Sequence, residues 1–269
     1  MVCILAPNKN EMDKKITEIQ DIGEFGLVDR IESLVKSNRK ETILGIGDDA
    51  AVINYSKVVT VITTDMLTEG IHFDLTYVPL KHLGYKAVAV NLSDIYAMNA
   101  EPAHITVSIG ISSKFSVEHI EELYGGILKA CQFYNVDLIG GDTVSSMNGL
   151  VISITALGFA KKNQIVRRSG AQENDLICVS GDLGAAFLGL KLLAREKEVL
   201  KGNPDIQPNF SGFEYLLERQ LKPEPRRDII LKLQEKSVLP TSMIDISDGL
   251  SSELMHICKR SDKGCRIYE

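Results

Sequence analysis

Six aspartates lie beside glycine, serine or threonine where an apolar run ends, and they are the residues of this chain best suited to chemistry. Residues 45–52 read GIGDDAAV, with Asp48 and Asp49 between apolar runs. Adjacent carboxylates repel each other, and burying them costs several kcal/mol unless a cation compensates. The glycines allow a phosphate to come close. A metal site at a strand end fits this stretch, but taken alone an exposed acidic turn fits better, because Asp and Gly are common turn residues.

The other carboxylates follow further along the chain. Asp65 ends a β-branched run, Asp142 follows two glycines, and Asp245 and Asp248 lie in IDISDGL. Asp94 is added to them because it falls on a predicted helix among apolar neighbours, where capping is not available. If the fold gathers these groups, their mutual repulsion predicts Mg²⁺, which prefers oxygen ligands. Otherwise each Asp is a separate cap or turn, and for Asp248 the two interpretations weigh equally.

Composition excludes several other chemistries. The five cysteines are scattered, with no CxxC pair and an odd count, which argues against a zinc site and disulfides. There is no GxxxxGK[ST] motif and no protein-kinase catalytic loop. A net charge of −6 without a long Lys/Arg cluster gives no support for nucleic-acid binding. An acidic protein that handles phosphates would need metal ions to supply positive charge.

The sequence carries no targeting or membrane signal that we can identify. No apolar run approaches the ~18 residues needed to span a bilayer. The first 21 residues lack the pattern of a signal peptide, because their apolar piece is short and charges follow it. We therefore expect a cytoplasmic protein with no membrane partner.

The predicted elements divide the chain into two halves. At 269 residues and 44% hydrophobic, it can build one large domain or two ordinary ones. A polar, basic segment near 160–172 marks the boundary, so we expect a mobile leader at 1–22, a first domain at 23–160 and a second at 161–269. The fold class is α+β or α/β, and the first half lacks the strict alternation of a doubly wound sheet. Helical spacing is found at 23–36, 79–98, 117–131, 185–198, 223–236 and 250–258, and strand patterns are found at 58–63, 104–111, 137–139, 150–159, 175–180 and 243–246.

Seven short motifs occur in order, and together they resemble the thiamine-monophosphate kinase family. That family belongs to the superfamily of aminoimidazole ribonucleotide synthetase. Each motif alone is weak, whereas seven in order are highly specific, and EGIHF and IDISDGL favour this kinase over its relatives. The resemblance covers about residues 23–268. The motifs are GDDAA at 47–51, TTD at 63–65, EGIHF at 69–73, AVNLSD at 89–94, GGDT at 140–143, RSGA at 168–171 and IDISDGL at 244–250.

The resemblance implies a fold, a reaction and a set of site residues. It implies an N-terminal α/β domain that pairs with its copy in a homodimer, a C-terminal α/β domain, and ATP-dependent phosphorylation of thiamine monophosphate to thiamine diphosphate. The role of Asp48 stays open. The resemblance makes His72 a substrate contact, although a lone His is usually structural or solvated. The implied Mg²⁺ contacts are Asp49, Thr63, Thr64, Asp65, Asp94, Asp142, Asp245 and Asp248, and the implied ATP contacts are Tyr124, Gly141, Asp142, Arg168 and Ser247.

One departure from the family concerns the end of the chain. The family continues past this endpoint with an acidic and an aromatic residue that bind thiamine, whereas this sequence stops at Glu269, where a strand at 265–268 begins. We therefore expect an incomplete second domain, and a chain that ends in this way could bind ATP while failing to hold its acceptor. The alternatives are another ATP-dependent enzyme of the superfamily and a non-catalytic ATP-binding or assembly protein.

The expected mechanism is direct in-line transfer assisted by several Mg²⁺ ions. The acceptor is a phosphate oxygen that is already ionised at neutral pH, so no general base is needed. The sequence offers no convincing Ser/His or Cys/His nucleophile pair, which argues against a phosphoenzyme.

Overall fold

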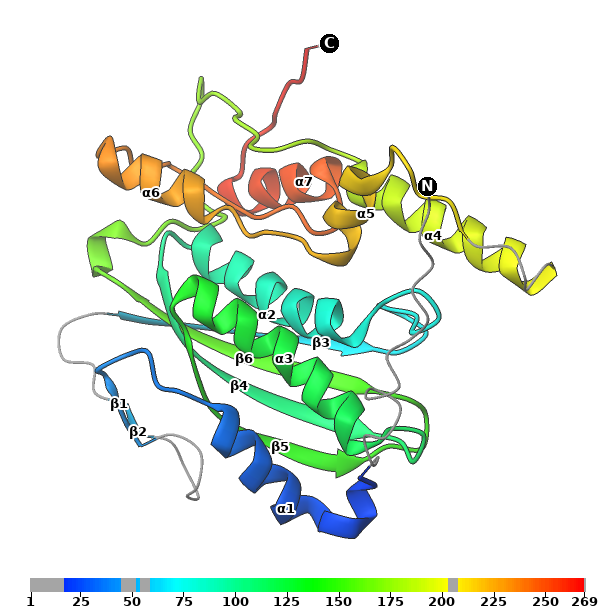
Figure 1. The fold of residues 1–269 in the computed structure, drawn as a ribbon. Coiled ribbons are helices and arrows are strands. Elements are labelled where there is room, and N and C mark those ends of the chain that lie inside the picture. The colour runs from blue at the N-terminus through cyan, green and yellow to red at the C-terminus, as the bar shows by residue number, and fades with distance from the viewer. Residues whose placement is uncertain (1–16, 45–51, 54–58, 203–207, 269) are drawn as a thin grey trace, which may run out of the picture.

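A mixed four-stranded sheet is the central layer of the first half of the molecule (Figure 1). The computed structural model describes residues 17–44, 52–53, 59–202 and 208–268. The sheet order is β3-β6-β4-β5, with β4 and β5 parallel and β6 antiparallel to both of its neighbours. This mixed order agrees with the predicted lack of a doubly wound sheet. The strands are β3 (Val59–Thr68), β4 (Glu101–Ile111), β5 (Asp137–Ser145) and β6 (Val151–Ala160).

Two helices, α2 (Leu80–Ala97) and α3 (Val117–Tyr134), cover one face of this sheet (Figure 1). Both bury apolar side chains, and Ser116 is the N-cap of α3. They pack closely because each offers a glycine to the other. A Cβ on Gly84 would lie 2.0 Å from the Leu123 carbonyl oxygen, and one on Gly126 would lie 1.9 Å from the Lys81 carbonyl oxygen. The main hydrophobic core lies between these helices and the sheet.

The N-terminal part of the fold begins earlier than we predicted. Helix α1 (Ile19–Leu34) starts inside the predicted leader, with a break at Gly23, where φ is +67°. The backbone N–H of Thr17 donates to Glu118 Oε1 at 2.6 Å, so this segment is attached to α3. The leader prediction is therefore wrong for residues 17–22. Short strands β1 (Thr42–Leu44) and β2 (Val52–Ile53) pair on either side of the GDDAA motif, which lies outside the described residues.

The second half consists of helices and connecting segments. After the 3₁₀ turn η2 (Lys162–Gln164), the described residues form α4 (Ala185–Gly202), α5 (Glu214–Leu221), α6 (Arg227–Glu235) and α7 (Leu250–Ser261). They lie over α2 and α3 on the side away from the sheet (Figure 1). Helix α5 was not predicted. The strands predicted at 175–180, 243–246 and 265–268 do not form, because no second strand pairs with them in the described part of this half.

No helix in the described part of the chain is long and apolar enough to cross a membrane. The cytoplasmic location stays a prediction.

Candidate active site

Three of the predicted carboxylates come together between β3, α2 and the segment that precedes α7. Asp94 on α2 accepts a hydrogen bond from Thr63 Oγ1 at 2.6 Å. Asp245 of the second half accepts one from Ser93 Oγ at 2.7 Å, so adjacent α2 residues contact both halves of the site. The backbone N–H of Asp65 donates to Asn91 Oδ1 at 3.1 Å. We call Asp65, Asp94 and Asp245 the acidic cluster.

Strand alternation and helix spacing explain why these side chains meet. Along β3, exposed and half-buried residues alternate, which directs Thr63 and Asp65 toward α2 and Ile62 and Thr64 away from it. On α2, Asn91 and Asp94 are three residues apart and therefore share a face. Asn91 is buried, and its Nδ2 donates to the Ala87 carbonyl at 2.9 Å. The helix thus fixes the amide that holds the Asp65 backbone.

The acidic cluster is costly in electrostatic terms. Burial raises the pKa of all three carboxyls, and the cluster's own charges raise it further: Asp245 acts on Asp65, Asp65 on Asp94, and Asp94 on Asp245. His72 opposes the shift at Asp65, and Arg168 opposes it at Asp94 and Asp245, but the net direction remains upward. Groups with this pattern favour a bound cation, which would stabilise their ionised forms.

The donor chemistry of the cluster fits Mg²⁺ held jointly with phosphate. Within the described ranges, no group of three His, Cys, Asp or Glu side chains is placed to hold a metal ion by itself. Mg²⁺ usually takes one or two protein carboxylates and completes its shell with water and substrate phosphates. Oxygen donors from separate elements suit that arrangement better than a closed protein cage. Asp49, the predicted ligand from GDDAA, lies outside the described residues.

A cavity of about 440 Å³ opens beside the cluster. Its walls come from β3, the C-terminal end of α2, the segment after η2, the segment before α7, and α7 itself. We call it the arginine cavity, because three arginines and two cluster carboxylates share its polar wall, namely Arg167, Arg168, Arg260, Asp94 and Asp245. Charges of both signs at one concave surface fit a ligand such as a metal-bound polyphosphate.

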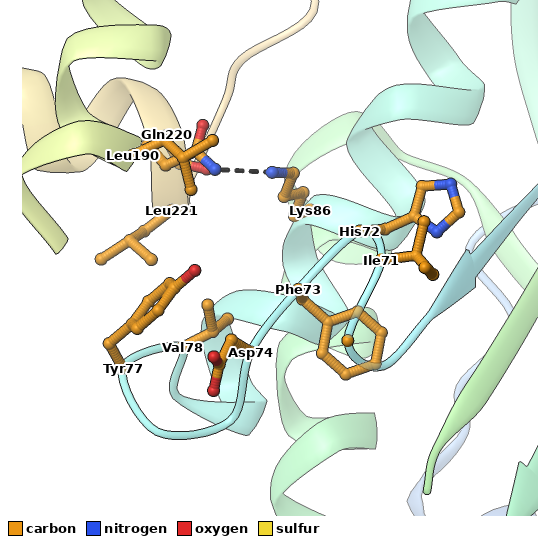
Figure 2. Close-up of a pocket in the computed structure, with 11 residues that line it drawn as sticks. Ile71, His72, Phe73, Asp74, Tyr77, Val78, Lys86, Leu190, Gln220 and Leu221 are labelled. Atoms are coloured by element: carbon orange, nitrogen blue, oxygen red, sulfur yellow. Dashed lines mark hydrogen bonds between the residues drawn. The ribbon is translucent and has the colours of Figure 1, made fainter. Parts of the chain in front are cut away.

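A second, smaller cavity of about 140 Å³ lies between the loop at 70–78, α2, and helices α4 and α5 (Figure 2). We call it the loop cavity. His72 Nδ1 accepts the Thr68 N–H at 3.0 Å. Lys86 Nζ donates to the Gln220 carbonyl at 3.2 Å, and burial lowers the pKa of this lysine. Lys86 is eight residues before Asp94 on α2, so the two cavities are offset by about 12 Å along the helix.

Asp142 and Gly141 are not part of this group within one chain. The sequence placed GGDT after the end of a strand, but β5 continues through it. Gly141 permits this, because a Cβ there would lie 1.9 Å from the Val107 carbonyl oxygen of β4. Strand β5 is at the opposite edge of the sheet from β3. Cross-strand pairing from β5 through β4 and β6 to β3 places Asp142 on the same face of the sheet as Met66. The Met66 side chain is exposed on the face away from α2.

Thr64 and Tyr124 also lie away from the cluster. Thr64 Oγ1 donates to the Ile154 carbonyl at 3.1 Å and contacts Thr155 Oγ1 at 3.1 Å, on the exposed face of the sheet. Tyr124 is only 4% exposed, belongs to the core and lines neither cavity, and burial raises its pKa. The structure therefore gives no support to the predicted contacts of these two side chains with metal or ATP.

The loop that carries Ser247 and Asp248 is held by a residue that the sequence did not suggest. Both residues are exposed at the start of α7. The backbone N–H groups of Asp248 and Gly249 donate to the carboxylate of buried Glu253, at 3.2 and 3.0 Å. A glutamate one turn into a helix is a known stabiliser of the preceding turn, so its spacing could have indicated this role. Asn91 and Ser93 were missed as well, although both lie inside AVNLSD.

Comparisons with known proteins point to one family. The family model described as "AIR synthase related protein, N-terminal domain" matches residues 47–160. A thiamine-monophosphate kinase of Bacillus subtilis (strain 168) is 37% identical over 229 residues, which are 84% of this chain and 67% of that protein. The chain belongs to the thiamine-monophosphate kinase family.

Solved structures of this kinase family have the same fold. The crystal structure of a thiamine-monophosphate kinase from Stenotrophomonas maltophilia K279a matches with a TM-score of 0.74 at 36% identity, and the match covers 90% of this chain and 73% of that one. The structure described as "AaThiL complexed with AMPPCP and TMP" matches with a TM-score of 0.68 at 33% identity, over 91% and 72%. The predicted family, its AIR-synthase-type N-terminal domain and the two-domain α/β fold class are thereby confirmed.

Proposed function

We propose that this chain transfers the γ-phosphoryl group of ATP to thiamine monophosphate, forming thiamine diphosphate. The observation that supports this most is the meeting of Asp65, Asp94 and Asp245, from three separate elements, beside a cavity with three arginines. Family membership supports it independently, since the related structure is described as a complex with AMPPCP and TMP.

The two cavities suit two different substrates. The arginine cavity is large, carries most of the positive charge and adjoins Asp94 and Asp245, so we assign it to ATP. The loop cavity contains His72, which is close enough to Asp65 to influence its pKa, so we assign that side to the acceptor. The acidic cluster then lies between donor and acceptor. Two polyanions have to be aligned there, and positioning is the main source of catalysis in phosphoryl transfer.

The proposed mechanism is direct in-line transfer with no phosphoenzyme. Bound Mg²⁺ would neutralise phosphate charge at the carboxylates of the cluster, with Asp49, Asp248 and Thr63 as further proposed contacts. Arg168 and Ser247 are the proposed ATP contacts of the second half. The acceptor oxygen is already ionised, so these residues bind and orient rather than move a proton. Isolation of a phosphorylated form of this protein during turnover would contradict the mechanism.

Pairing of two copies through the sheet would explain the position of Asp142. The sheet face opposite α2 presents exposed Ile62 and Met66 on β3, an unusual surface for a protein that works alone. Asp142 and Gly141 belong to the far edge of the same sheet. We propose a homodimer in which this face is covered by a second copy, so that Asp142 can act at a metal and ATP site to which both copies contribute.

An assay of ADP release with different acceptors tests the proposed reaction. We expect release with thiamine monophosphate and Mg²⁺, and almost none with thiamine or with nucleotide precursors as acceptors. Asp94→Asn should lower kcat/KM by at least about 100-fold, because a proposed metal ligand is lost (a ΔΔG‡ of roughly 2.7 kcal/mol). Release with a different acceptor would favour another enzyme of the superfamily. Binding of ATP without release would favour a non-catalytic role.

Asp142→Asn tests the proposal for the homodimer site. Asp142 is exposed on β5, so the variant should fold normally. We expect it to lose Mg²⁺-dependent binding of AMPPCP in calorimetry while keeping the wild-type melting temperature. Normal turnover by this variant would show that the assignment of Asp142 is wrong.

A further inference from the structure

The C-terminal end of α7 is attached to the RSGA segment by one hydroxyl group. Ser261 Oγ accepts the backbone N–H groups of Gly170 at 3.1 Å and Ala171 at 3.2 Å. The same Oγ lies 3.4 Å from the Arg168 carbonyl oxygen, to which it can donate. The backbone of this segment lies close to residue 241, because a Cβ on Gly170, whose φ is +125°, would lie 2.5 Å from the Thr241 carbonyl oxygen. The last turn of α7 is thereby fixed against the segment that carries Arg168.

This attachment places Arg260, the neighbour of Ser261, in the wall of the arginine cavity. Arg167 and Arg168 reach the same cavity from the segment after η2, so the three guanidinium groups come from two separate elements. Among the residues that the structure describes, none of the three lies within 4.0 Å of a carboxylate oxygen. Arg168 acts electrostatically on Asp94 and Asp245, whereas Arg260 is not among the groups that shift either pKa.

We propose that Arg260 is a binding residue for the phosphates of a nucleoside triphosphate. This inference rests on the proposed function and adds a residue to its ATP side. A guanidinium group can donate two parallel hydrogen bonds to a phosphate, and Arg is the usual residue where such recognition is needed. Without a carboxylate partner in the described residues, the charge of Arg260 is available to a ligand in this cavity.

The ligand is the nucleotide rather than the phosphate of the acceptor. His72, the proposed acceptor contact, belongs to the loop cavity, which Arg260 does not line. The arginine cavity has about three times the volume, and apolar Val61, Met98 and Met243 form another part of its wall. An apolar surface beside a cluster of cations suits a molecule with a base at one end and phosphates at the other.

Lys259 provides the matched control. Both Lys259 and Arg260 lie in the last turn of α7 and are exposed, so each interacts favourably with the C-terminal end of the helix dipole. Only Arg260 lines the cavity. A role limited to helix stability or surface charge would therefore give Lys259→Ala and Arg260→Ala the same phenotype.

Calorimetric titration with AMPPCP and Mg²⁺ tests the proposal in the full chain. We expect Arg260→Ala to weaken binding about tenfold or more, Arg260→Lys to weaken it less, and Lys259→Ala to stay within about twofold of wild type. The melting temperatures of the two alanine variants should match. In kinetics, Arg260→Ala should raise KM for ATP and leave KM for thiamine monophosphate unchanged.

Different results would contradict the role of Arg260 and the proposed function. Equal AMPPCP affinity of Arg260→Ala and Lys259→Ala would overturn the role of Arg260, whatever the reaction is. So would a raised KM for thiamine monophosphate with unchanged AMPPCP affinity, because Arg260 would then serve the acceptor. If wild type binds AMPPCP but forms no thiamine diphosphate, the proposed reaction fails while the effect of Arg260→Ala on binding still decides its role. Absence of AMPPCP binding by wild type would overturn both.

Discussion

The two halves of this chain are stabilised in different ways. Residues 59–160 bury a continuous core between one face of a sheet and two helices, and most of its large side chains are fully inaccessible. In the described residues after 160, few side chains are buried and many large apolar ones are exposed. Those buried there are Val166, Ala185, Leu193, Pro225, Ile230, Glu253 and Leu254, and those most exposed include Leu176, Tyr268, Met255, Ile267 and Phe187.

The contrast shows how the site depends on the docking of the two halves. The first half holds Asp65 and Asp94 on rigid elements, whereas Asp245 and Arg168 come from the second half. Much of what connects the halves is polar: Ser93 bonds Asp245, Lys86 bonds the Gln220 carbonyl, and Glu224 accepts bonds from Tyr85 at 2.9 Å and from Tyr134. Small polar contacts between domains permit relative motion. We therefore expect substitutions in the first half to change stability and those at the contacts to change activity.

The largest expected effect is on stability and comes from truncating a buried side chain in the core of the first half. Leu92 on α2 is fully buried, so Leu92→Ala should lower the free energy of unfolding by about 2–5 kcal/mol. Leu188 on α4 is 52% exposed, and Leu188→Ala should cost less than about 1 kcal/mol. Urea denaturation followed by circular dichroism measures both. An equal decrease in the free energy of unfolding for both variants would show that the two halves do not differ in packing as described.

A pair of neighbouring glycines on α3 sharpens the comparison further. Gly126→Ala would press a Cβ against the Lys81 carbonyl oxygen and should destabilise by about 1–3 kcal/mol or more. Gly125 has no heavy atom within 4 Å of that position, so Gly125→Ala should stabilise by about 0.5–1 kcal/mol through helix propensity. Thermal unfolding compares them. A stabilising effect at both positions would contradict the close packing of α2 on α3.

Ser93→Ala tests a contact between the halves. It removes the hydroxyl that donates to Asp245, worth about 1 kcal/mol, so kcat/KM for ATP should fall about fivefold with a small change in melting temperature. Ser33→Ala is the control, because Ser33 Oγ donates only within α1, to the Arg30 carbonyl at 2.6 Å. An unchanged kcat/KM in Ser93→Ala would mean that this bond does not hold Asp245 in its working position.

The smallest effect concerns Asp74, whose carboxylate pairs with Lys197 of α4. Burial raises the pKa of Asp74, but hydrogen bonds from Lys197 and Thr76 outweigh it and lower the pKa to about 2. A lowered folded pKa stabilises the protein above the unfolded value of 3.8, and this stability is lost as pH falls toward 2. Asp74→Asn should cost less than about 1 kcal/mol at pH 7. The difference in free energy of unfolding between Asp74→Asn and wild type should become smaller near pH 3. A difference that stays constant with pH in urea titrations would contradict the pairing of Asp74 with Lys197.

The sequence predicted the elements whose own pattern is strong. Helix α2, with a carboxylate on an apolar face, and strands β4 and β6, with clear alternation, lie where expected. Strand β5 was cut short because two glycines look like a turn, and only the contact with β4 explains them. The strands predicted in the second half failed because a strand needs a partner, which local alternation does not reveal.

The candidate site was predicted in the same uneven way. The pairing of Asp94 with Thr63 and the proximity of Asp245 agree with the expected gathering of carboxylates. The position of Asp142 depends on the order of strands across the sheet, which single motifs do not contain. Arg260 stands in no motif, and only the three-dimensional attachment of α7 brings it to the cavity.

The most direct test is the product formed from ATP, Mg²⁺ and thiamine monophosphate, separated by chromatography. We expect wild-type chain to form thiamine diphosphate and ADP in equal amounts, and Asp94→Asn and Asp245→Asn to form almost none while keeping the wild-type fold. ATP binding without any thiamine diphosphate, or undiminished product from both variants, would contradict the proposal that the acidic cluster is the site of phosphoryl transfer.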